Sequence, residues 1–140
     1  MNLYWEDLKG PKVIRQVPNA GHGLEGGRDG ALASLAAFFR HVATDRDLPQ
    51  LSWSFDADPD RATLTMRATP QPVAVRFWTA RSSDKDFRDA RWNSQTLQAT
   101  DSRYVGTLAR QPDGHLAVFG EYEFQSEGER WSLTTLVYRR

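Results

Sequence analysis

Apolar and polar residues alternate one by one along much of the chain after Leu51. A period of two places the apolar side chains of a strand on one face of a sheet, so the pattern predicts half-buried β-strands. Turn residues such as Pro, Gly, Asp and Ser separate the alternating runs. The expected strands lie within residues 51–56, 62–67, 73–77, 95–99, 104–109, 116–124 and 131–137.

Short strands at this density are typical of an antiparallel β-sandwich of immunoglobulin or fibronectin type. The clearest turn signal is Gln111-Pro-Asp-Gly114, because Pro fixes one backbone dihedral angle and Gly accepts a positive one. Five tryptophans could form a platform for carbohydrate. Trp53 and Trp131, however, are in phase with the apolar residues of their strands, which favours a place in the core.

Residues 29–45 predict an amphipathic helix. Asp29 is the expected N-cap, and Pro49 follows the end of the helix. A stripe of apolar residues recurs at helical spacing. It consists of Leu32, Leu35, Phe39 and Val42. Such a stripe usually covers a sheet; left uncovered, it favours association with another polypeptide or a second copy of the chain.

The segment before this helix combines a predicted strand with a histidine-bearing loop. Residues 12–17 form a short apolar run, and a lone strand needs a sheet to join. Residues 18–24 follow at once as a Gly-rich loop that carries His22. From the residues alone, a histidine between two glycines is most simply an ordinary loop residue.

Two groups of residues, in order along the chain, carry a family resemblance. The first consists of Tyr4-Trp-Glu-Asp-Leu8, Gly10-Pro-Lys12 and Val17-Pro-Asn-Ala-Gly-His22. The second consists of Trp78-Thr-Ala80, Asp86-Phe-Arg88 and Ala90-Arg-Trp92. Together they resemble the PhoPQ-activated pathogenicity-related protein family. The resemblance implies an exported α/β-hydrolase-like protein with an added C-terminal β-domain, of which this chain would be the C-terminal third.

The resemblance also implies a role for His22 as the catalytic histidine of a serine hydrolase, with the nucleophile and the acid upstream of Met1. No Gly-x-Ser-x-Gly nucleophile elbow occurs in the sequence. The chain by itself is therefore expected to be inactive and to need an upstream hydrolase polypeptide. Its expected organisation is a strand-loop-helix remnant of an α/β-hydrolase fold over residues 1–48 and an accessory β-sandwich over residues 49–140.

Trp78, Asp86, Arg88 and Trp92 are the candidate binding residues. Aromatic rings next to arginines and carboxylates could bind a ligand or dock on a hydrolase domain. The simpler interpretation, which we favour, is that both tryptophans belong to the core or rim and that Asp86 and Arg88 form an ion pair that orders a loop. An autonomous β-sandwich module that binds protein or glycan is the alternative function.

Composition excludes several classes of function and of site. The 18 basic and 18 acidic residues form neither a basic stripe for nucleic acid nor an acidic tail. With no cysteine, the chain has no disulfide and no thiol nucleophile. His22, His41 and His115 lack the spacing of metal ligands, so neither metal nor cofactor is expected. No apolar run approaches the ~20 residues of a membrane span. The first residues also lack the features of a signal peptide, although the resemblance implies a periplasmic or extracellular protein.

Overall fold

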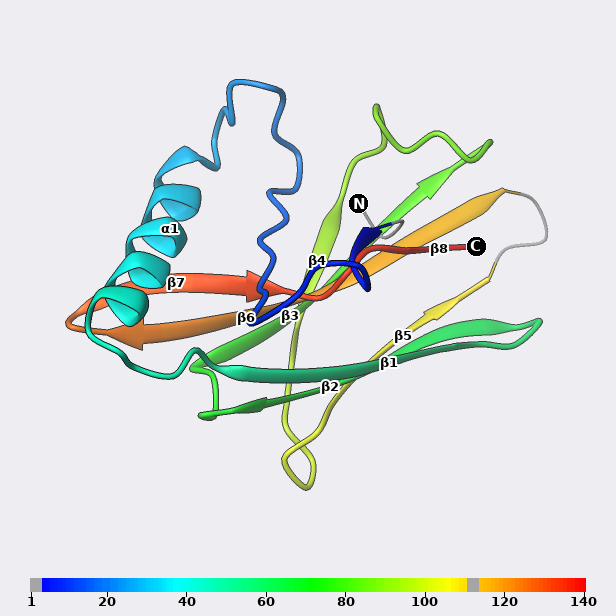
Figure 1. Ribbon diagram of the computed structural model, residues 1–140. Helices are drawn as coiled ribbons and strands as arrows, with labels where there is room; N and C mark the ends of the chain where they lie inside the picture. Colours follow the sequence, from blue (N-terminus) through cyan, green and yellow to red (C-terminus); the bar gives the residue numbers. More distant parts are fainter. Residues whose placement is uncertain (1–3, 111–113) are drawn as a thin grey trace.

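The computed structural model describes residues 4–110 and 114–140, which form a mainly β, antiparallel structure with one helix (Figure 1). One sheet has the strand order β1-β2-β5. The other has the order β4-β3-β6-β7, with β8 pairing with β6 beyond the end of β7. The elements are α1 (Arg28–Ala43), β1 (Gln50–Ala57), β2 (Arg61–Thr69), β3 (Ala74–Ser82), β4 (Asn93–Leu97), β5 (Tyr104–Ala109), β6 (His115–Ser126), β7 (Glu129–Thr134) and β8 (Tyr138–Arg139).

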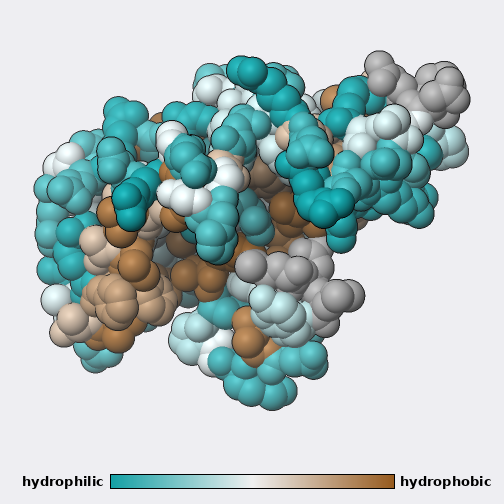
Figure 2. Space-filling view, turned by 90° about the horizontal axis from the view of Figure 1, so that it is seen from above, coloured by the Kyte–Doolittle hydropathy of each residue, from teal (hydrophilic) through white to brown (hydrophobic). Residues whose placement is uncertain are grey.

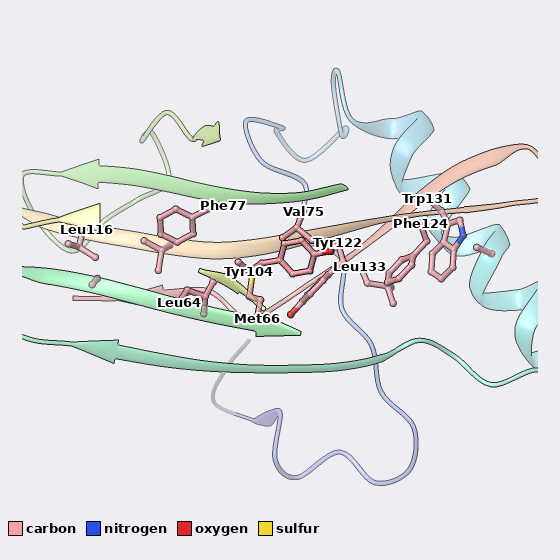
Figure 3. Close-up of a cluster of buried hydrophobic side chains, with 13 residues drawn as sticks. Leu64, Met66, Val75, Phe77, Tyr104, Leu116, Tyr122, Phe124, Trp131 and Leu133 are labelled. Atoms are coloured by element: carbon pink, nitrogen blue, oxygen red, sulfur yellow. The ribbon is translucent and has the colours of Figure 1, made fainter. Parts of the chain in front are cut away.

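The two sheets face each other across one apolar core, so the predicted β-sandwich is confirmed (Figure 3). Leu64 and Met66 of β2 point from the smaller sheet towards Phe77 of β3 and Tyr122 of β6. Complete burial of each such side chain stabilises the fold by about 1.5–3 kcal/mol. Close approach requires glycine at Gly120, where an added Cβ would lie 2.0 Å from the sulfur of Met66. The immunoglobulin or fibronectin type stays a prediction.

Most expected strands are present, with differences at the third, fourth and last. The third runs on to Ser82, and β4 begins at Asn93 instead of residue 95. The strand expected over residues 131–137 ends at Thr134, as the end of β7, and the chain returns to the sheet only in β8, from Tyr138. At the break, Thr135 donates its backbone N–H to the Gly120 carbonyl (2.9 Å) while its hydroxyl accepts from the Gly120 N–H (2.9 Å). A side-chain oxygen thus replaces a backbone carbonyl and interrupts the ladder. The predicted turn at residues 111–114 lies outside the described residues except for Gly114.

The expected strand over residues 12–17 is wrong: this segment is extended but joins no sheet as a strand. It lies along the outer edge of β7 instead. Thr134 donates its backbone N–H to the Ile14 carbonyl (2.8 Å), and its hydroxyl accepts from the Gln16 N–H (3.0 Å). Because the second partner is a side chain, no regular ladder of backbone hydrogen bonds forms.

The helix α1 is confirmed, with a different cap and a different buried face. Gly27 occupies the N-cap, and Asp29 lies in the first turn, where its charge favours the helix dipole. The helix packs against β7 through small residues, among them the buried Ser34 and Ala37. The apolar stripe faces solvent, with exposed fractions between 50% and 62%. It contains Leu32, Leu35, Phe39 and Val42.

Apolar side chains accordingly gather at the α1 end of the molecule, on the left of Figure 2. The stripe therefore does not cover a sheet, and it matches the other expectation from the sequence, an uncovered apolar patch. Within the described ranges, no helix is long and apolar enough to cross a membrane.

Candidate functional site

His22 lies in the loop between the extended segment and α1, with its side chain exposed. Leu24 donates its N–H to the Gly21 carbonyl (3.1 Å), and Gly27 donates to the Leu24 carbonyl (3.0 Å), which makes two successive turns. Among residues 4–110 and 114–140, none forms a hydrogen bond or an ion pair with the His22 imidazole. The ring is therefore free to meet a group presented from outside.

Glu25 explains the glycines on either side of His22. Its carboxylate folds back over the loop and accepts the Gly21 N–H at 3.0 Å. A Cβ on Gly21 would lie 2.8 Å from one carboxylate oxygen, and a Cβ on Gly23 would lie 2.6 Å from the other. Both glycines thus make room for a side chain that orders the loop.

Asn19 ties the His22 loop to the loop before β4. Its amide group donates to the Trp92 carbonyl (2.9 Å) and accepts from the Trp92 N–H (2.8 Å). The backbone of Asn19 has a φ of 56°, a left-handed conformation that asparagine tolerates better than most residues. The sequence pattern does not single out Asn19; the signal it carries is an amide that can both donate and accept, within a Pro- and Gly-rich loop.

Trp78 and Trp92 both contact Phe119 on the outer face of the larger sheet, the face turned away from β1, β2 and β5. Trp78 stacks on Phe119 of β6, with ring centres 6.0 Å apart, and Trp92 meets the same ring edge-on at 5.0 Å. Both tryptophans are half-buried. The geometry agrees with the simpler interpretation, in which these residues pack at the rim of the fold.

A buried carboxylate lies next to this aromatic cluster. Glu121 of β6 is only 6% exposed at its side chain and accepts the Trp78 indole N–H at 2.6 Å. Arg15, from the extended segment before the His22 loop, places a guanidinium nitrogen 3.0 Å from the other carboxylate oxygen. The contact is ionic, because no atom of the described residues forms an aligned hydrogen bond with that buried nitrogen.

Glu123, two residues further along β6, forms a second charge cluster on the same face. It pairs with Arg76 of β3 at 2.8 Å and with Arg130 of β7 at 2.7 Å. Burial raises the pKa of this carboxyl, but hydrogen bonds and charge from the two arginines outweigh burial and hold the pKa below its ordinary value.

The predicted ion pair between Asp86 and Arg88 is present in the connection between β3 and β4. The guanidinium Nε of Arg88 donates to both carboxylate oxygens of Asp86, at 2.8 and 3.0 Å. The side-chain hydrogen bond from Arg88 lowers the pKa of Asp86 to about 2. Ser82 donates its hydroxyl to the Asp86 carbonyl (2.7 Å), so the pair lies in an ordered loop.

An open hollow of about 560 Å³ separates the His22 loop from this connection. Its walls bring together Asn19 and Gly21 on one side and residues 87–92 on the other. The lining includes Arg88 and Trp92, whereas Trp78 and Asp86 lie outside it. The fold therefore joins the His22 loop to two of the four candidate binding residues.

No metal site is apparent in the part of the chain that the structure describes, since it contains no suitable cluster of three His, Asp or Glu side chains. His41 and His115 are separate from His22. The His41 ring lies 5.4 Å from that of Trp131, and His115 lies 3.3 Å from the Arg140 carbonyl.

Comparison with known proteins gives a family match over residues 1–88, to the PhoPQ-activated pathogenicity-related proteins. A curated relative, autocrine proliferation repressor protein A of Dictyostelium discoideum, is 27% identical over 145 residues. That alignment covers 87% of this chain and 29% of the relative, so the chain spans less than a third of the relative's length.

Two solved structures resemble the sandwich at low identity. A Br derivative of BhCBM56 has 9% identity and a TM-score of 0.46, and covers 68% of this chain and 95% of its own. A β-1,3-glucan binding domain of carbohydrate-binding module family 56 has 11% identity and a TM-score of 0.44, and covers 65% of this chain and 98% of its own.

Proposed function

Because the chain belongs to the PhoPQ-activated pathogenicity-related protein family, we propose that it is the histidine-bearing C-terminal part of a serine-hydrolase-like protein. The observation that carries the proposal is the exposed His22 ring on an ordered, glycine-flanked loop, without a partner among the described residues. The same loop lies within the family match.

In this proposal His22 acts as general base and then general acid. Its imidazole takes the proton of a serine hydroxyl as the serine attacks an ester or amide carbonyl, and returns the proton to the leaving group. A carboxylate must bind the other ring nitrogen to fix the tautomer. The serine and this acid belong to another part of the protein, so the 140 residues alone do not hydrolyse substrate.

The division into two parts follows the same proposal. Residues 1–48 belong to the hydrolase-like domain, and residues 49–140 are an accessory β-sandwich. The exposed stripe on α1 supports this division, since it is an apolar surface that no element of the described residues covers. Beside it lies an open groove of about 480 Å³ between α1 and the extended segment, lined by Val13, Val17, Leu24, Leu35 and Phe38 among others. We propose that the rest of the hydrolase-like domain packs on this surface, and that a second copy occupies it only if no such domain exists.

A second candidate function has support from the hollow beside the His22 loop. Arg88 and Trp92 in its lining offer a charged fork and an aromatic ring to a protein or glycan ligand. The test is binding of the whole chain to immobilised glycans, compared with Trp92→Ala and with Trp53→Phe as a control on the core side. Equal binding by all three proteins excludes the hollow as a glycan site.

The experiment for the main proposal begins with the coding sequence immediately upstream of Met1. The complete protein that it defines is then treated with a fluorophosphonate probe and assayed on a p-nitrophenyl ester. We expect probe labelling, and we expect His22→Ala to lower kcat by about 10⁴-fold or more. His115→Ala is the matched control and should retain full activity. Hydrolysis that survives His22→Ala contradicts the catalytic assignment.

A further inference from the structure

We infer that the β-sandwich positions the His22 loop through Arg15, which binds Glu121 on the outer face of the larger sheet, and through Asn19, which binds the loop before β4. The inference rests on the proposed function, because positioning matters only if His22 must meet a serine. It assigns to the sandwich a task at the catalytic loop, and it makes Asn19 and Glu121 positioning residues.

Asn19 fixes the loop in both distance and orientation. Its amide forms two hydrogen bonds to the backbone of one residue, Trp92, so it cannot rotate without breaking at least one of them. Asn19 lies three residues before His22. The two residues are 73 positions apart in the sequence, so the restraint on the loop comes from the sandwich and not from residues of the loop itself.

Arg15 fixes the segment that leads into the loop. Its partner Glu121 is buried and is itself oriented by the indole N–H of Trp78. Removing either charge leaves the other without its ionic partner in a water-poor place, which strongly disfavours that arrangement. The pair therefore holds the extended segment against β6.

The two anchors are connected through the aromatic cluster on the same face. Glu121 binds Trp78, Trp78 stacks on Phe119, and Phe119 contacts Trp92. Trp92 in turn binds Asn19. The contacts therefore lead from Arg15 across the sheet to Asn19, and the backbone between Arg15 and Asn19 closes the loop. A displacement of either tryptophan is therefore transmitted to the segment just before His22.

The first experiment measures loop order in the 140-residue chain by ¹⁵N relaxation. We expect the order parameters of Gly21, His22 and Gly23 to fall from about 0.85 to below about 0.6 in Asn19→Ala. Asn93→Ala is the matched control, because that exposed amide donates a long hydrogen bond (3.5 Å) to the neighbouring Arg91 carbonyl and, within the described residues, does not bind the His22 loop. Unchanged order parameters in Asn19→Ala overturn the inference.

Glu121 is tested in the same way with Glu121→Gln. The amide can still accept from Trp78 but no longer carries the charge that Arg15 requires. Glu123→Gln is the control, since its arginine partners lie in the sandwich. We expect increased motion at residues 15–23 in Glu121→Gln and none in Glu123→Gln. Equal motion in the two variants overturns the role of Glu121.

The second experiment uses the complete protein and separates this inference from the proposed function. We expect Asn19→Ala to lower kcat about 10²-fold with KM nearly unchanged, because a misplaced base still allows binding. Asn19→Asp keeps the hydrogen-bond acceptor but loses the donor, so its kcat should lie between that of the unmodified protein and that of Asn19→Ala. If His22→Ala abolishes hydrolysis while Asn19→Ala equals Asn93→Ala, the positioning role is overturned and the proposed function stands. If loop order falls as expected but hydrolysis survives His22→Ala, the proposed function is overturned.

Discussion

The hydroxyl of Ser34 in α1 lies 2.8 Å from the carbonyl oxygen of Ser132 and accepts the N–H of the same residue at 3.1 Å. One helix side chain thereby satisfies both backbone groups that β7 would otherwise offer to a further strand. The contact also explains why the small face of α1, and not its apolar stripe, turns towards the sheet.

Ser34→Ala is expected to lower the free energy of unfolding by about 1–3 kcal/mol, because the buried N–H and carbonyl of Ser132 lose their partner. Urea unfolding monitored by tryptophan fluorescence measures the change. Ser94→Ala in the exposed β4 strand is the control, with an expected change within about 0.5 kcal/mol. Equal effects from both substitutions contradict the role of Ser34.

Gly120→Ala is expected to destabilise the fold by about 1–3 kcal/mol, since the new methyl group would lie 2.0 Å from the sulfur of Met66. Met66→Val shortens the opposing side chain, so the double variant should be more stable than the sum of the two single effects predicts. Chemical unfolding of all four proteins gives the coupling energy. A coupling energy of zero shows that the two side chains do not compete for space.

Gly30→Ala should act in the opposite direction. The position lies within α1, and an added Cβ would meet only a guanidinium nitrogen of Arg15 at 3.7 Å. Alanine lowers the entropy of the unfolded chain and favours the helix, so we expect a gain of about 0.4–1 kcal/mol. A rise in the midpoint of thermal unfolding confirms the gain; a fall indicates that contact with Arg15 is less tolerant than the geometry implies.

The charge cluster at Glu123 should make stability depend on pH in the acid range. Its pKa is lower in the folded chain than the ordinary 4.5, so the stabilisation is fully present above about pH 4.5 and is lost as the pH falls through the native pKa. Glu123→Gln removes the titrating group. We expect the variant to be less stable at pH 7 and to lose less stability between pH 5 and pH 2, as measured by urea unfolding at each pH. Parallel pH profiles for the two proteins contradict this assignment.

The Asp86–Arg88 pair is exposed, so removing it should change the pKa of Asp86 measurably and the stability of the fold very little. Arg88→Ala should raise the pKa of Asp86 from about 2 towards its ordinary value of 3.8, because the dominant side-chain hydrogen bond disappears. An NMR titration of the Asp86 carboxyl carbon measures the shift. Arg91→Ala, in the same loop, serves as the control and should leave the Asp86 titration unchanged.

The sandwich was predictable because, in a half-buried strand, the alternation of apolar and polar residues follows the alternation of buried and exposed side chains. Leu64 and Met66 are buried while their polar neighbours are not, and the sequence pattern carries that information directly. The break at Thr135 was not predictable, because it depends on a hydroxyl that replaces a carbonyl opposite Gly120. The orientation of α1 was missed for a similar reason: periodicity identifies an apolar stripe, but the contact between Ser34 and Ser132 decides which face is buried.

The candidate site was predictable only in its parts. The sequence identified the His22 loop and the residues around Trp92, but it could not show that they touch. Asn19 and Trp92 are 73 positions apart, and no local pattern reports such a contact. The family resemblance points to His22 as the candidate catalytic histidine, but it carries no information about the contacts of Asn19 and Arg15 that hold the loop.

The covered edge of β7 also bears on how the chain can be divided. Ser34 occupies the backbone groups of Ser132, and Ile14 occupies the N–H of Thr134; both belong to the first 48 residues. A sandwich cut at residue 49 would present these groups to water, next to the buried Trp131 and Leu133 side chains of the same strand. Such an edge recruits strands from other molecules. Cleavage in the link between α1 and β1 is thus expected to turn a discrete protein into one that aggregates through β7.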